Sequence, residues 1–159
     1  MSVLLYSVTM NPVKLLVAGD LMPSENNYAL FEEGHTDYYR KFHQLQQKTG
    51  LFIRPNTVGA GFCPLHPGFV RIGHYVRIGK NCTVLPMVLI GKRRSGQCSI
   101  TIGDNCYIGT GVTILGPLTI GNNVSIAAGA VVLSDILDNV VVAGVPAKVV
   151  KIKDLVEAK

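Results

Sequence analysis

Aliphatic residues recur at every sixth position over most of the chain beyond residue 70. One register contains Ile72, Ile78, Val84 and Ile90, and resumes in phase as Ile102, Ile108, Ile114, Ile120, Ile126 and Val132. A second register lies four positions later and contains Val76, Cys82, Val88, Cys106, Val112, Leu118, Val124, Ala130 and Ile136. Positions six apart on an α-helix are rotated by about 600°, so a helix would scatter these residues around its surface.

A solenoid accounts for this period directly, because each hexad can form one short strand and one corner. Three hexads close a triangular coil of about 18 residues, and residues one coil apart then stack at the spacing of paired strands. We therefore expect Ile102 to stack on Ile120, Ile108 on Ile126 and Ile114 on Val132. Asparagine tolerates positive φ, so we expect this conformation at the corner residues Asn81, Asn105, Asn122 and Asn123.

The period is interrupted at two places. Val58 and Pro64 are two residues out of step with Ile72, which predicts an offset at His66-Pro67-Gly68. Between Ile90 and Ile102 the expected aliphatic position is Gly96, inside the polar stretch 91–98. Insertions in solenoids are tolerated at corners and often serve binding, so both interruptions are candidate sites.

The segments outside the coils are less regular. Asp37 is a candidate N-cap for a helix over 38–48, with Gly50 as its C-terminal stop. This helix is expected to cover the first coil, and a second short helix is predicted over 151–158. These features divide the chain into an N-terminal segment (1–50), a β-helix domain (51–150) and a C-terminal tail (151–159).

Composition and charge narrow the class of protein. Hydrophobic residues make up 48% of the chain and charged residues 16%, and this balance excludes intrinsic disorder. The chain contains no Trp. The net charge is +5, and the excess lies in 51–150, where the acidic residues are Asp104, Asp135 and Asp138. An anionic ligand is therefore expected there. Nucleic acid is disfavoured, because no aromatic residues interleave with the basic run at Lys92.

The termini and cysteines indicate a cytoplasmic protein without a membrane span. The apolar stretch of residues 1–20 lacks a basic start and is interrupted by Lys14, so it fits neither a signal peptide nor a span. Cys63, Cys82, Cys98 and Cys106 form no CxxC pair, and disulfides are not expected. Cys82 and Cys106 fall in the second register and are expected in the core.

The repeats and several local motifs resemble those of hexapeptide-repeat acyltransferases. The motifs are Lys48-Thr49-Gly50, Arg54-Pro55-Asn56-Thr57-Val58-Gly59, His66-Pro67-Gly68, Ile102-Gly103-Asp104-Asn105 and Ala143-Gly144-Val145-Pro146-Ala147-Lys148. The resemblance covers about residues 38–153 and points to the serine acetyltransferase-like and polysaccharide O-acetyltransferase branch. It implies an all-β, left-handed parallel β-helix with a short helical N-terminal segment.

The resemblance implies that His66 is the general base that removes a proton from an acceptor hydroxyl. Two positions depart from serine acetyltransferases. Leu65 stands where they have Asp, and Ser99 stands where they have a second His. The resulting prediction is acetyl transfer to a hydroxyl of a sugar or polysaccharide precursor. Serine O-acetyltransferase and a non-catalytic binding or assembly scaffold are the alternatives.

The resemblance also implies the binding partners. Acetyl-CoA is the expected acyl donor, with Thr110 and Ala128 lining the pantetheine groove and Lys148 and Lys151 near the nucleotide. The basic residues Lys92, Arg93 and Arg94 are candidates for binding an anionic acceptor or CoA phosphates. A homotrimer is expected, in which one chain supplies His66 and its neighbour the groove. His74 is expected to point into solvent, and too few histidines lie in the coils for a zinc site.

Overall fold

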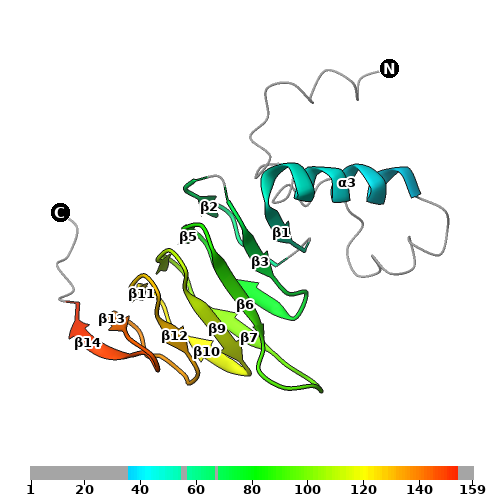
Figure 1. Ribbon diagram of the computed structural model, residues 1–159. Helices are drawn as coiled ribbons and strands as arrows, with labels where there is room; N and C mark the ends of the chain where they lie inside the picture. The colour runs from blue at the N-terminus through cyan, green and yellow to red at the C-terminus, as the bar shows by residue number, and fades with distance from the viewer. Residues whose placement is uncertain (1–35, 55–56, 67, 154–159) are drawn as a thin grey trace.

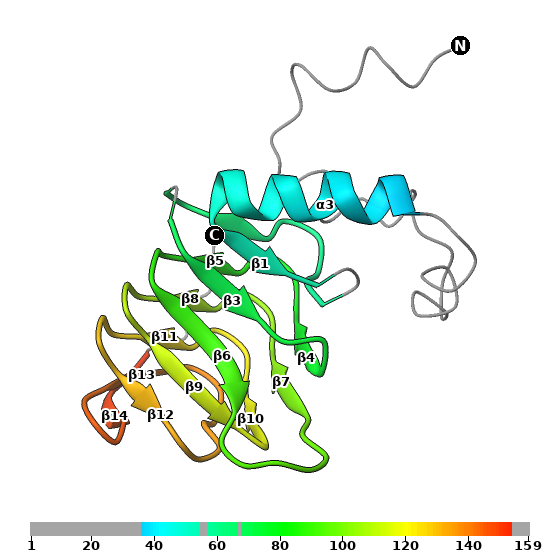
Figure 2. The same ribbon diagram turned by 45° about the vertical axis from the view of Figure 1, so that its right-hand side comes forward.

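The computed structural model describes residues 36–54, 57–66 and 68–153. The chain winds into a prism whose three faces are sheets of parallel strands, apart from the last strand of the chain, which is antiparallel (Figures 1 and 2). Sheet A contains β1 (Leu51–Ile53), β3 (Val70–Ile72), β6 (Val88–Lys92), β9 (Thr113–Gly116) and β12 (Val131–Val132). Sheet B contains β4 (Val76–Ile78), β7 (Ile100–Ile102) and β10 (Leu118–Ile120). Sheet C contains β2 (Cys63–Pro64), β5 (Thr83–Val84), β8 (Tyr107–Ile108), β11 (Ser125–Ile126), β13 (Val140–Ala143) and β14 (Lys148–Ile152).

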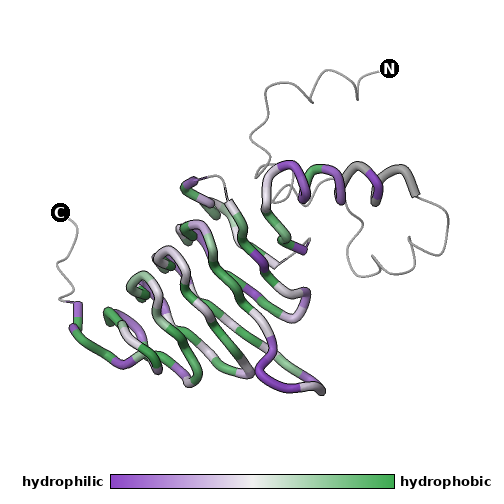
Figure 3. The backbone as a smooth tube through the Cα atoms, in the orientation of Figure 1, coloured by the Kyte–Doolittle hydropathy of each residue, from purple (hydrophilic) through white to green (hydrophobic). Residues whose placement is uncertain are grey.

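The strand register confirms the stacking expected from the repeat. Ile102 pairs with Ile120, Ile108 with Ile126 and Ile114 with Val132. These side chains form ladders inside the prism, and each is at most 1% exposed. The backbone tube is hydrophobic (green) over much of the coils and hydrophilic (purple) over the loop that follows β6 (Figure 3). Burial of stacked Ile and Val side chains, at about 25 cal/mol per Å² of apolar surface, therefore dominates the stability of the coils.

The last coil contains a third offset that the repeat did not reveal. Ile136 was expected in the second register, but it bridges Ile120, which belongs to the first. These two residues are 16 positions apart, whereas Ile114 and Val132 are 18 apart. The corner after β12 is therefore two residues shorter. Asp135 at this corner accepts a hydrogen bond from the Thr119 N–H at 2.8 Å, which ties the short corner to the coil before it.

Asparagine side chains line the corner between sheets B and C. Asn81, Asn105, Asn123 and Asn139 have φ between 54° and 59°, which confirms three of the four expected positions. Asn122 is the exception. Its side-chain oxygen instead accepts the Asp104 N–H at 2.8 Å, while its own N–H donates to Asp138 at 2.7 Å. The corner is thus held by side chains that satisfy backbone donors of adjacent coils.

Helix α3 (Thr36–Thr49) covers the first coil, as predicted, and packs on β1. The helix ends at Gly50, where φ is 73° and the N–H donates to Gln46 O at 2.8 Å. Such a left-handed residue is a common helix terminator. The buried Gln46 side chain donates from Nε2 to Ile53 O at 3.3 Å, which fastens the helix to the coil.

The prediction of a C-terminal helix over 151–158 is wrong for the residues that the structure describes. Lys148–Ile152 forms β14, which pairs antiparallel with β13, and residues 154–159 lie outside the described part. The free pairing edge of β13 outweighs the weak helical pattern of this segment. Helix α3, which has 14 residues, is too short and polar to cross a membrane, and the described residues contain no other helix.

Cys82 and Cys106 lie in the core, as expected, at 0% and 2% exposure. They stack on adjacent coils, and the Cys106 N–H donates to the Cys82 sulfur at 3.4 Å. The hydrogen bond between the two thiols and burial raise the pKa of the Cys106 thiol, so it stays protonated. These cysteines therefore act as small core side chains.

Candidate active site

His66 lies at the corner between sheets C and A, within a local insertion. Five residues separate the paired positions Pro64 and Val70, whereas three separate Val84 and Val88 in the next coil. The two extra residues fall between two backbone bonds, Leu65 N to Val84 O at 3.1 Å and Met87 N to Phe69 O at 2.6 Å. This is the offset that the repeat predicted.

The His66 side chain is exposed in this insertion. Its neighbour Leu65 is half-exposed and carries no polar group. Within the described residues no side chain forms a hydrogen bond with the imidazole. The ring is therefore accessible to a bound molecule from outside the prism.

Thr110 and Ala128 occupy the same corner in later coils. Both are exposed, and the Gly129 N–H donates to Thr110 O at 2.8 Å, which places them one above the other. Among the described residues, neither the Thr110 N–H nor the Ala128 N–H has an acceptor. Gly109 packs closely here, since a Cβ on it would lie 2.7 Å from Ala128 N. The corner thus presents free backbone donors along a surface of small residues.

Lys148 and Lys151 lie on β14, at the far end of this corner. Lys148 pairs with Ala143 at the end of β13. The preceding residue, Val142, accepts the Ala127 N–H at 2.9 Å, so Ala143 lies one coil beyond Ala128. Lys151 pairs with Val141 farther along sheet C, and both lysines are exposed. Coils are about 4.8 Å apart, so the corner runs from the imidazole of His66 past two backbone donors to a cation.

His66 and the groove residues Thr110 and Ala128 lie along the same corner of the prism, in different coils. Lys92, Arg93 and Arg94 lie instead at the corner between sheets A and B. The two corners border opposite edges of sheet A, so one chain does not bring its own His66 to these basic residues.

The loop that carries the basic residues is an insertion of six residues. Nine residues separate Ile90 from Ile100, whereas three separate their partners Ile72 and Val76. Lys92 begins the loop, and its ammonium donates to Gly96 O at 2.8 Å. The insertion therefore projects from the prism while the ladders on both sides continue in register (Figure 2).

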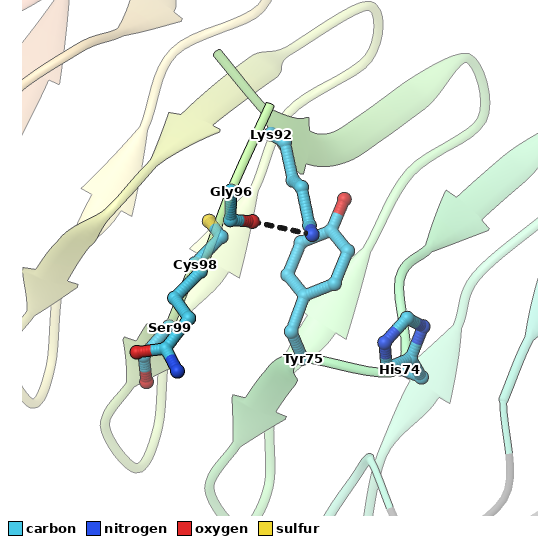
Figure 4. Close-up of a pocket in the computed structure, with 7 residues that line it drawn as sticks. His74, Tyr75, Lys92, Gly96, Cys98 and Ser99 are labelled. Atoms are coloured by element: carbon cyan, nitrogen blue, oxygen red, sulfur yellow. Dashed lines mark hydrogen bonds between the residues drawn. The ribbon is translucent and has the colours of Figure 1, made fainter. Parts of the chain in front are cut away.

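An open hollow of about 770 Å³ lies between this loop and the coil before it. Its lining residues are His74, Tyr75, Lys92, Gly96, Gln97, Cys98 and Ser99. Figure 4 shows the Lys92 ammonium beside the Tyr75 ring, at 5.0 Å from the ring centroid, with His74 on the other side of that ring. The rings of His74 and Tyr75 meet edge to face, with centroids 5.1 Å apart.

The sequence pattern missed His74 and Tyr75 as site residues. His74 is exposed, as expected, but the six-residue insertion makes it one wall of a hollow. Of the three basic residues, Lys92 lines the hollow, and Arg93 turns to donate from Nη1 to Leu133 O at 3.3 Å. Arg94 is exposed and lies outside the lining. The sequence did contain a signal for these two residues. His74 and Tyr75 lie at the same corner as the inserted loop, one coil earlier, so the loop can fold beside them.

Asp104 and Asp138 lie away from both regions, whereas Asp135 lies in the last coil of the corner between sheets A and B, which is also the corner of the hollow. Asp104 and Asp138 accept backbone N–H groups at the corner between sheets B and C, and Asp135 accepts the Thr119 N–H in the last coil. Across 36–54, 57–66 and 68–153, no three His, Cys, Asp or Glu side chains gather as metal ligands would. Within the described residues, the lining of the hollow therefore contains no acidic side chain.

Two family models match the coils. Residues 99–134 match the bacterial transferase hexapeptide (six repeats), and residues 70–116 match the hexapeptide repeat of succinyl-transferase. The two matches together span both sides of the six-residue insertion. The repeat that the sequence shows is thus the one that defines hexapeptide transferases.

Relatives and solved structures agree with this assignment. The serine acetyltransferase of Bacillus subtilis is 38% identical over 127 residues, which are 73% of this chain and 58% of the relative. The crystal structure of the serine acetyltransferase from Brucella abortus has a TM-score of 0.69 and 31% identity, covering 79% of this chain and 52% of that one. The structure of that enzyme with coenzyme A has a TM-score of 0.68, 32% identity and the same coverage.

A Neisseria gonorrhoeae serine acetyltransferase structure in complex with serine has a TM-score of 0.64 and 33% identity, covering 77% of this chain and 51% of that one. This chain thus spans little more than half the length of these three proteins. With its left-handed parallel β-helix and its hexapeptide repeats, the chain is a hexapeptide-repeat protein that resembles the serine acetyltransferases.

Proposed function

We propose that the protein is an acetyl-CoA-dependent O-acetyltransferase with His66 as general base. The observation that carries this proposal is the order of groups along one corner. An exposed imidazole is followed by free N–H groups at Thr110 and Ala128 and then by Lys148. A pantetheine arm has amides that suit the free donors, and CoA phosphates suit the lysine.

The proposed reaction is direct transfer between two bound substrates. His66 accepts the proton of the acceptor hydroxyl while the oxygen attacks the thioester carbonyl, and a C–O bond forms. Backbone N–H groups of the insertion stabilise the oxyanion, and Gly68 N–H has no acceptor among the described residues. The C–S bond then breaks, and the CoA thiolate takes the proton from the imidazolium.

Serine is the acceptor that the relatives favour, because the proteins that resemble this chain are serine acetyltransferases and one is solved with serine. A hydroxyl of a sugar is the second candidate. It is supported by Leu65 and Ser99, which replace two polar positions of serine acetyltransferases near the reacting groups. The apolar Leu65 next to His66 offers no counter-charge to an amino group.

Release of CoA from acetyl-CoA tests the activity and separates the acceptors. With purified protein, we expect acceptor-dependent thiol release when L-serine or a panel of sugars is supplied, with a turnover of about 1 s⁻¹ or more for the correct acceptor. The acetylated product identified by mass spectrometry checks that oxygen is the acceptor atom. Calorimetry that detects no acetyl-CoA binding would favour the non-catalytic scaffold instead.

The proposed assembly is a homotrimer in which sheet A faces the neighbouring chains. Its outward side chains include Phe52, Leu89, Leu115 and Val131, which are half-buried, and the exposed Met87 borders it. Sheet A lies between the corner of His66 and the hollow of the inserted loop. Packing of copies through this sheet would bring the His66 corner of one chain to the hollow of the next.

Mixed trimers test this arrangement. We expect the His66→Ala and Lys92→Ala variants, each weakly active alone at an acceptor concentration well below KM, to regain about a quarter of the wild-type site activity after unfolding and refolding together. About a quarter of the interfaces in the mixture combine both intact residues. The measurement is acetyl transfer by the refolded mixture. A mixture no more active than the mean of its components would place both residues in one chain's site.

A further inference from the structure

We propose that the hollow binds the acceptor through a carboxylate, and that the acceptor needs no amino group. The chemical class is a small or sugar-based hydroxy acid. This inference rests on the proposed function, because it assigns the acceptor half of the same site. It is carried by the lining of the hollow and by the places of the carboxylates in the coils.

Lys92 provides the positive charge of the hollow. Its ammonium uses one donor for Gly96 O at 2.8 Å and lies 5.0 Å from the Tyr75 ring centroid. An ammonium has three donors, so two remain for a ligand. Neither a salt bridge nor a carboxylate neutralises Lys92 within the described residues. The contacts with Gly96 and Tyr75 hold the charge in place, which lowers the entropic cost of using it for binding.

Other groups of the hollow complement an oxygen-rich ligand. His74, Gln97 and Ser99 supply polar groups, and the half-buried Tyr75 supplies an aromatic surface between His74 and Lys92 (Figure 4). None of these three polar side chains hydrogen-bonds to another described residue. A single carboxylate can accept from both a cation and a hydroxyl, and such charge-assisted hydrogen bonds are the stronger ones.

Within the described residues, an α-ammonium group would find no acidic side chain in the lining of the hollow. Asp104 and Asp138 accept backbone donors at the corner between sheets B and C, and Asp135, in the last coil of the hollow's own corner, accepts the Thr119 N–H. The hollow itself contains no acidic residue, and the residue before His66 is the apolar Leu65. Because a cation near Lys92 is repelled, a ligand with carboxylate and hydroxyl but without ammonium fits better than a zwitterion.

Three acceptors of similar size test the proposal. Glycerate has a carboxylate and no ammonium, L-serine has both, and ethanolamine has only the ammonium. We expect kcat/KM for glycerate to equal or exceed that for L-serine, and kcat/KM for ethanolamine to be at least about tenfold lower than either. Glucuronate is included to distinguish a carboxylated sugar from a smaller hydroxy acid. Equal use of ethanolamine and L-serine would overturn the carboxylate assignment.

A pair of variants localises the effect. Lys92→Met is expected to raise KM for glycerate about tenfold, with a small change in kcat and none in the KM for acetyl-CoA. Lys80→Met is the matched control, because Lys80 is an exposed lysine at the corner between sheets B and C. An equal rise in KM for both variants would show that net charge, rather than the hollow, binds the acceptor.

Binding without turnover keeps this inference separate from the proposed activity. We expect glycerate to shift the His74 imidazole signals in NMR spectra of the wild-type protein at millimolar concentration, and to shift them less in Lys92→Met. If these shifts occur but no acceptor is acetylated, the proposed function fails and the carboxylate site stands. If acetylation occurs but glycerate leaves His74 unperturbed, the assignment of the hollow is wrong.

Discussion

Exchanging His66 for Ala is expected to lower kcat for acetyl transfer by about 10²- to 10⁴-fold, the range that a positioned general base contributes. The loss falls on kcat because the imidazole acts on the hydroxyl proton as the C–O bond forms. The KM for acetyl-CoA should change little, since the free donors at Thr110 and Ala128 and the charge of Lys148 remain. Steady-state kinetics with acetyl-CoA and the acceptor identified in the panel measure both quantities.

His43→Ala is the control for this variant, because His43 is an exposed histidine on α3 and lies outside the coils. It should retain wild-type kcat. Circular dichroism and calorimetric titration with CoA establish that the His66 variant is folded and binds the donor. Transfer at the wild-type rate by a folded His66→Ala protein would remove this residue from the mechanism.

Ile114→Ala is expected to destabilise the fold by about 2–5 kcal/mol, the typical cost of removing a fully buried isoleucine side chain. Ile114 is 0% exposed and stacks between Ile90 in the coil before and Val132 in the coil after. The cavity left by the truncation would interrupt a ladder in the middle of the prism. The parallel strands on either side hold the backbone in place and limit its collapse into the space.

Thr113→Ala in the same strand provides the comparison. Thr113 points outward and is half-buried, so its truncation should cost less than about 1 kcal/mol. Urea unfolding of the two variants, followed by circular dichroism, gives the difference in midpoint. Similar midpoints for both variants would mean that the interior ladders contribute much less to stability than their burial indicates.

The hexad pattern was sufficient to predict the coils and the placement of both insertions. It succeeds because each coil buries the side chain at every sixth position inside the prism, and such a position requires an apolar residue. Ile102, Ile108 and Ile114 are examples. It failed at Ile136, where an aliphatic residue in the expected place pairs with the other register. The six-residue period does not reveal a corner that is two residues shorter, because an apolar residue then still points into the prism.

The candidate site was predicted in part. His66 was a candidate because the six-residue period is interrupted around it. In the structure, Thr110, Ala128 and Lys148 lie along the same corner of the prism. The hollow was not predicted, because the period describes only inward positions and says nothing of outward ones. Tyr75 lines a site only because a loop from the next coil folds beside it, a contact that depends on tertiary structure.

The two ends of the prism are closed in different ways, which fixes the length of the stack. At the first coil, α3 lies over the edge next to β1. At the last coil, the turn before β14 caps β12, with Ala147 N–H donating to Val131 O at 2.8 Å, and β14 reverses the strand direction. A parallel β-helix with two open ends would template the addition of further chains and grow into a fibre. Here α3 covers the edge of β1 at one end and the turn before β14 covers the edge of β12 at the other, so neither edge is free to pair with a further strand.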